Sequence, residues 1–239
     1  ETLSLPHGLA VKAGKFFSDF GYLNAKHSHE WDFVDRPLIH SLTLGGHGLN
    51  EIGVQGSWLA PTPFYLLAGV EALQGKNEWA FAYEGEAPLP SHDGPRLWVG
   101  WLKAAPNLPG PHALEVGIFG AWGRHQEAHD GDLDGTTDHW LDGDSSLWGL
   151  HAVYKRASPR PYGQGDLVIQ AEYIRRYRDL EVVDHDLVPD LMGRSREDDQ
   201  DGYYLQATYG FAPRWRAGLR WDQVGLANTT DLPDGSSEE

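Results

Sequence analysis

The sequence predicts an all-β protein whose antiparallel strands form a transmembrane β-barrel. Apolar residues alternate with polar or small ones in segments of about ten residues, which is the period of a strand with two different faces. Short turns containing Pro alternate with connections of roughly 20 to 30 residues. Short periplasmic turns and long extracellular loops are typical of outer-membrane barrels. Ten Trp and ten Tyr would supply their two aromatic girdles.

The clearest hairpin runs from Glu51 to Leu73. In its first arm Val54 lies on an apolar face and Gln55 on the opposite face, and in its second arm Glu71 lies opposite the apolar residues. The turn 60–63 contains two Pro residues. The hairpin therefore predicts two strands with one lipid-facing side and one wet side.

The same pattern predicts nine strands: 9–17, 51–59, 64–73, 96–103, 112–123, 147–155, 166–177, 203–211 and 215–224. The long connections are 18–50, 74–94, 124–145 and 178–202, and a short helix is expected within 32–44. Bacterial single-chain barrels have even strand counts, and porins that leave an aqueous channel use about 16 strands. We therefore interpret residues 1–239 as a single barrel domain that is part of a larger barrel.

Composition excludes several classes of protein. A net charge of −16 disfavours nucleic-acid binding, which requires a basic face. The chain has no Cys, so disulfides, thiolate catalysis and zinc-thiolate sites are excluded. No apolar run approaches the roughly 18 residues of a membrane helix. No nucleophile elbow, P-loop or HExxH motif is present, and we predict that the protein is not an enzyme.

Residues 10–60 carry a more specific pattern. Gly14, Lys15 and Phe16 lie near the end of a predicted strand, and an Asp35-Arg36 pair follows. A Gly-rich step then spans 45–48, and the next predicted strand contains the sequence GVQ at 53–55. This stretch resembles the outer-membrane porins related to the phosphate-selective porin O/P family. The resemblance implies a barrel of the porin type in the bacterial outer membrane. It also implies that residues 18–50 fold into the lumen as a constriction loop.

Candidate functional residues follow from the expected constriction loop and from the alternation of the strands. Those expected at the pore constriction are Asp35, Arg36, His40 and His47. Those expected on the lumen wall, by strand alternation, are Lys12, Glu71, Glu115, Glu172, Arg176, Arg216 and Arg220. Charged side chains in a wet lumen set the sign and width of the path for a solute.

Two patterns suggest metal ions, although no cofactor is required for diffusion. Asp130, Asp132, Asp134 and Asp138 match the alternate carboxylates of a calcium loop, but its twelfth position is Leu141 rather than Glu. His27 with His29, and His125 with His129 and His139, are candidate ligands for zinc or copper. The simpler explanations are a solvated acidic surface loop for the Asp residues and polar loop filling for the His residues.

The sequence favours a porin-like channel that lets small hydrophilic solutes or ions diffuse passively through the outer membrane. Its partners would be the lipid bilayer and these solutes, and a homotrimer is one arrangement left open. One alternative is a structural sheath around a multihaem cytochrome, which would need a lumen free of a constriction loop. The other is a soluble carbohydrate-binding β-sandwich, whose binding surface the aromatic residues would serve.

Overall fold

The computed structural model describes residues 1–2, 5–129, 137 and 139–238, except the side chain of His129. The strands are β1 (Leu9–Phe17), β2 (Asn50–Leu59), β3 (Tyr65–Leu73), β4 (Leu97–Ala105), β5 (His112–His129), β6 (His139–Arg156), β7 (Leu167–His185), β8 (Ser195–Ala212), β9 (Trp215–Val224), β10 (Thr229–Asp231) and β11 (Ser237–Glu238). Helix α1 spans Leu38–Leu44, and short 3-10 helices span Pro6–Gly8, Ser28–Glu30, Pro161–Gly163 and Pro189–Leu191. No helix in these described ranges is long and apolar enough to cross a membrane.

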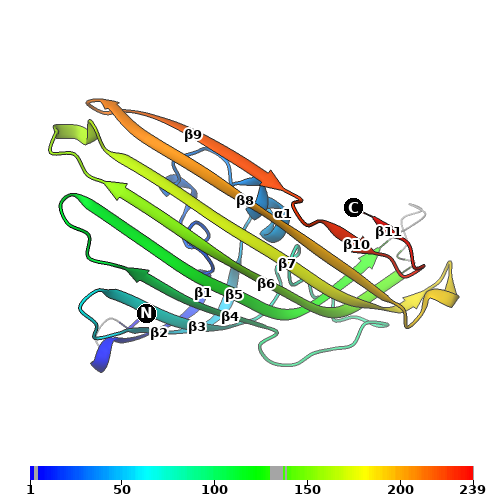
Figure 1. The fold of residues 1–239 in the computed structure, drawn as a ribbon. Coiled ribbons are helices and arrows are strands. Elements are labelled where there is room, and N and C mark those ends of the chain that lie inside the picture. Colours follow the sequence, from blue (N-terminus) through cyan, green and yellow to red (C-terminus); the bar gives the residue numbers. More distant parts are fainter. Residues whose placement is uncertain (3–4, 130–136, 138, 239) are drawn as a thin grey trace.

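The strands form one antiparallel sheet in which β1 to β8 lie in chain order (Figure 1). Both β9 and β10 pair with β8, and β11 pairs with β10. Among the described residues the sheet does not close, since β1 lies at one edge and β9 and β11 at the other. The antiparallel all-β prediction is confirmed. In the part of the chain that the structure describes, the expected strand number is corrected from nine to eleven, and the single sheet does not fit the two-sheet sandwich alternative.

The two faces of the sheet differ sharply. On the outer face large apolar side chains stay exposed, for example Val70 at 63%, Ile118 at 62% and Leu219 at 83%. On the inner face polar side chains are buried, among them Gln55 and Glu71 of the hairpin. The sequence placed the apolar and polar sides of this hairpin correctly, because the period of two is unbroken from 51 to 59 and from 65 to 73.

The connections expected at 124–145 and 178–202 are wrong over most of their length. Strands β5, β6, β7 and β8 extend into them, so that each strand has 18 or 19 residues in all. We call residues 124–129, 139–145, 178–185 and 195–199 the polar extension. Their alternation is carried by charged residues that pair across strands, such as Arg178 with Asp198 at 2.7 Å. A search for alternating apolar residues alone therefore does not predict the strands of the polar extension.

Residues 18–50, called the inner segment below, lie on the inner face (Figure 1). Phe20, Ile39 and Leu49 of the segment are buried in one core with Phe81 and with inward residues of the sheet such as Leu147. The short helix expected within 32–44 is confirmed as α1. It starts directly after Pro37, whose ring suits the first turn of a helix, and ends at Gly45 with φ 71°.

Candidate functional site

The inner segment is held to the wall mainly by Glu172 of β7. Its carboxylate accepts hydrogen bonds from the N–H groups of Tyr22 (3.0 Å) and Leu23 (2.9 Å) and from the hydroxyl of Tyr204 (2.6 Å). His40 Nε2 of α1 lies 3.6 Å from the same carboxylate, and both side chains are fully buried. A charge buried this deeply is stable only because its oxygens are satisfied. Glu172 thus fixes the segment in place.

A second contact joins the inner segment to the edge strand β9. Arg220 donates to Asp35 Oδ2 at 2.6 Å and to Asp222 Oδ2 at 2.7 Å, and Asp222 accepts from the N–H of Leu38 at 3.0 Å. Arg216 donates to Asp32 at 3.0 Å. The two inward arginines of β9 therefore bind carboxylates of the segment, and they are only partly available to a solute.

A third group of contacts joins the start of the inner segment to β2 and β3. Glu71 accepts from the N–H of Asp19 at 2.9 Å and from Gln55 Nε2 at 2.8 Å. Lys12 and Lys103 each lie 3.6 Å from the carboxylate of Asp19. This arrangement leaves two lysines on an inner wall close to one shared carboxylate.

The register places all seven predicted wall residues on the inner face, although they differ in exposure. Glu115 lies 3.3 Å from His151 Nε2 and keeps 30% of its side-chain surface exposed. Arg176 is buried and donates to the carbonyls of Leu42 (3.3 Å) and Trp79 (3.0 Å), and it also bonds to Gln200. Arg176 of β7 thus connects the inner segment, through Leu42, and the connection between β3 and β4, through Trp79, to β7 and β8.

The four residues expected at the constriction all lie in the inner segment, but in different environments. Asp35 and His47 are exposed, whereas Arg36 and His40 are buried. The guanidinium of Arg36 lies 4.8 Å from the ring of Trp31. Asp35 and His47 are thus the members of this set that can meet a solute directly, and Arg36 and His40 act through the packing of the segment.

Two cavities flank the inner segment along the wall. One of about 310 Å³ lies towards the short turns and includes Lys26, Lys155 and Arg216, with the ring of Tyr22 between the two lysines at 3.7 and 6.0 Å. The other, of about 330 Å³, lies near the opposite ends of β1 and β2 and includes His47. Its remaining charged lining residues are Lys15, Glu51, Lys76 and Glu78. Cavities lined by charged side chains are therefore present on both sides of the inner segment.

Sequence reasoning missed the ion network on the inner face of the polar extension. Arg178 pairs with Glu127 and Asp198, and Arg196 lies 3.4 Å from each of the same two carboxylates. These residues sit in the parts that were expected to be loops. Charged residues at every second position, 176 and 178 in β7 and 196 and 198 in β8, were the sequence signal that could have predicted strands here.

His125, in the polar extension, is buried as a neutral imidazole. Its Nδ1 accepts from the N–H of Ala82 at 3.1 Å, and its Nε2 lies 2.8 Å from Glu127. Burial lowers the pKa of His125, Glu127 opposes this effect, and the positive charges of Arg178 and Arg176 add to it. The unfolded chain would therefore bind a proton below about pH 6.5 that the folded form excludes.

We expect the free energy of unfolding of the polar extension to be highest above that pH. It should fall by up to about 1.4 kcal/mol per pH unit as the pH drops below 6.5. Hydrogen exchange of the amides at 82–85, followed from pH 7.5 to 5, measures this change. The pH dependence should shrink in His125→Asn and persist in His112→Gln, which changes an exposed histidine at the other end of β5. Equal pH dependence in both variants would contradict the prediction.

The metal-ion predictions have little support from the described part of the chain. It contains no group of three or more His, Cys, Asp or Glu side chains arranged to hold a metal ion. Asp130, Asp132, Asp134 and Asp138 lie outside the described residues. The rings of His27 and His29 stack with centroids 5.6 Å apart, and those of His139 and His185 with centroids 5.1 Å apart.

Comparison with known proteins gives one informative match. An uncharacterized protein of Aquifex aeolicus (strain VF5) is 36% identical over 249 residues, which cover 99% of this chain and 50% of that protein. The chain thus spans about half the length of the curated relative that it matches. No protein-family model and no solved structure matches the chain.

Proposed function

We propose that this chain forms part of the wall of an outer-membrane β-barrel channel of the porin type. Small hydrophilic solutes or ions diffuse through it, and the inner segment narrows their path. The observation that carries the proposal is the contrast between the faces of one sheet. The outer face exposes apolar side chains that a lipid bilayer would cover, and the inner face holds charged residues around an infolded segment.

The limits of the apolar outer face support a membrane location. Trp98, Trp122 and Trp148 are about half exposed where β4, β5 and β6 approach the polar extension. Beyond them the outward residues become charged, for example Arg124 and Asp144, which bond at 3.0 Å. An apolar band bordered by indole rings and then by charges is the arrangement expected at a membrane interface.

The free edges of the sheet also fit this proposal. Unpaired strand edges are not tolerated in lipid, because their N–H and C=O groups find no partner there. Further strands would therefore pair with β1 and with β9. The match to half of a longer relative is consistent with such strands in a larger barrel.

The inner segment favours a channel over a sheath for a multihaem cytochrome. A sheath needs an open lumen for its partner, whereas here residues 18–50 pack on the inner face through Glu172, Arg220 and a shared core. A channel that selects solutes by charge and width uses such a segment directly.

Reconstitution of the whole protein that contains this chain, with the strands proposed beyond β1 and β9, tests the proposed function. It should float with liposomes after a carbonate wash and give stepwise conductance in planar bilayers. Absence of both would contradict the proposal, whereas flotation without conductance would favour a sheath.

The ion selectivity of the channel should depend on the cavity that contains Lys26, Lys155 and Arg216. Arg216 is 52% exposed, so we expect Arg216→Glu to shift the reversal potential in a salt gradient towards cation selectivity. Arg160→Gln, in the turn between β6 and β7, removes a charge outside this cavity and should leave the reversal potential unchanged. Equal reversal potentials for Arg216→Glu and the unmodified protein would exclude a role for this cavity.

A further inference from the structure

Strands β4 and β5 carry a ladder of matched residues on the outer face. Arg96 immediately precedes β4 and lies beside Arg124, whose N–H donates to the Arg96 carbonyl at 3.2 Å. The pairs that follow along the two strands are Trp98 with Trp122, Gly100 with Gly120, and Leu102 with Ile118. The ladder therefore runs from cations through indole rings and a step without side chains to aliphatic residues.

The glycine step opens a groove in the apolar band. A cavity of about 430 Å³ lies over Gly100 and Gly120 and is walled by Ile118, Trp122 and Trp148. The indole of Trp122 lies over Gly120, where an added Cβ would come within 2.6 Å of the ring. At Gly100 an added Cβ would meet nothing closer than 3.9 Å. The groove thus has room for an alkyl chain above Gly100.

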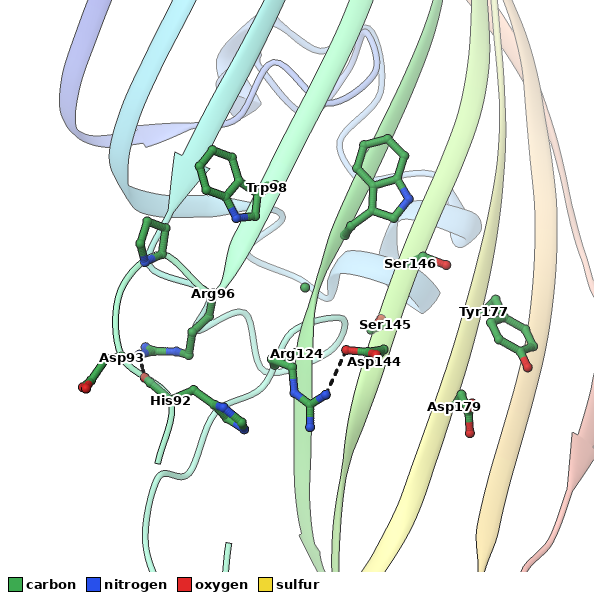
Figure 2. Close-up of a pocket in the computed structure, with 13 residues that line it drawn as sticks. His92, Asp93, Arg96, Trp98, Arg124, Asp144, Ser145, Ser146, Tyr177 and Asp179 are labelled. Atoms are coloured by element: carbon green, nitrogen blue, oxygen red, sulfur yellow. Dashed lines mark hydrogen bonds and ion pairs between the residues drawn. The ribbon is translucent and has the colours of Figure 1, made fainter. Parts of the chain in front are cut away.

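A second cavity, of about 690 Å³, adjoins this groove at Trp122, which lines both, and its other lining residues include charged and aromatic side chains. Figure 2 shows Trp98 on one side of it, Arg96 and Arg124 below, and Asp144 and Asp179 on the neighbouring strands. The groove is lined by apolar residues, and the second cavity adds the charged residues Asp93, Arg96, Arg124, Asp144 and Asp179. An amphiphile has this combination of an apolar and a charged end.

The charge of Arg96 is available to a ligand. Its guanidinium lies 3.6 Å from the ring centroid of Tyr83 and donates to the carbonyl of His92 at 3.1 Å. In the described ranges it has no carboxylate within ion-pair distance, and its Nε is buried without a hydrogen-bond partner. Arg124 differs, because it already bonds to Asp142 and Asp144. Asp93 lines the same cavity, but among the described residues Arg96 is the arginine of this cavity without a carboxylate within 4.0 Å.

We propose that the ladder binds one glycolipid of the outer leaflet whose head group carries a phosphate; this inference rests on the proposed membrane location. One acyl chain lies in the groove over Gly100. The phosphate binds the Arg96 guanidinium, which forms strong charge-assisted hydrogen bonds with phosphate oxygens. The sugar lies against Trp98, and its hydroxyls donate to Asp144 and Asp179. A phospholipid head group offers fewer hydroxyls to these carboxylates.

Native mass spectrometry of the whole protein that contains this chain, in detergent and titrated with lipid A, tests the proposal. We expect one tightly bound lipid A, and about tenfold weaker binding in Gly100→Leu and in Arg96→Gln. Gly56→Leu and Arg160→Gln are the matched controls. Gly56 is an outward glycine of β2 with nothing within 4 Å of an added Cβ, and Arg160 lies in a distant turn. Both controls should bind lipid A as the unmodified protein does.

Phosphatidylglycerol and dephosphorylated lipid A are the competing probes. Binding of either as tightly as lipid A would overturn the proposed head group, and unchanged binding by Gly100→Leu would overturn the groove. The flotation experiment separates this inference from the proposed function. A chain that enters liposomes but shows no saturable lipid A binding contradicts only the lipid site. A chain that does not enter them contradicts both.

Discussion

Replacing Glu172 by Gln should release the inner segment from the sheet and enlarge the proposed pore. The carboxylate accepts from two backbone N–H groups and one hydroxyl and also faces His40, all without access to water. A neutral amide presents an NH₂ group to at least one of these donors. We expect the attachment of the segment to weaken by about 3 kcal/mol, the usual consequence of leaving buried polar groups unpaired.

Hydrogen exchange at Tyr22 and Leu23 measures the release directly, and single-channel conductance measures its effect on the pore. Exchange at both amides should accelerate by about two orders of magnitude, and the conductance should rise. Glu115→Gln is the matched control, since Glu115 also points inward but contacts His151 of β6 rather than the inner segment. Unchanged exchange in Glu172→Gln would show that the apolar core alone holds the segment.

Replacing Arg178 by Ala should destabilise the polar extension by about 3 kcal/mol. Arg178 lies between the carboxylates of Glu127 and Asp198, and the side chains of Arg178 and Asp198 are 9% and 1% exposed. Its removal brings two anions together with less compensating charge, and breaking a buried pair costs far more than breaking a surface pair. Exchange of the β7 and β8 amides in the extension should accelerate accordingly.

Arg175→Ala is the control for this prediction. Arg175 is the outward residue three positions earlier on β7 and bonds to Asp199, but its side chain is 37% exposed. Water screens such a pair, so its loss should cost less than about 1 kcal/mol. Equal effects of the two substitutions would mean that the inner network is hydrated and contributes no more than the outer pair.

The sequence predicted the apolar part of the sheet accurately, because the apolar residues of its outer face repeat at every second position. Strands β1 and β9 begin and end at the predicted residues, and the faces of Gln55, Glu71 and Glu172 were assigned correctly. Alternation is a local property of the chain, so a single sequence contains all the information that it requires.

The sequence did not predict the polar extension or the partners of the candidate site. In the extension both faces are charged, so no apolar alternation marks a strand. The opposite charges of Arg178 and Asp198 indicate pairing only when the register of β7 and β8 is known. Glu172 was recognised as inward, but its bonds to residues 22 and 23 span about 150 positions. Local patterns carry no information about such contacts.

This separation along the chain sets an order of assembly. The inner segment leaves the sheet directly after β1, yet the carboxylate that anchors it belongs to β7, 149 and 150 positions later. Contacts between such distant positions form late, because a long loop must first close. We therefore expect the bonds from Tyr22 and Leu23 to Glu172 to form after the contact of Asp19 with Glu71 of β3, which spans only 52 positions. The inner face beside β7 would then be covered only after the strands that form it have paired.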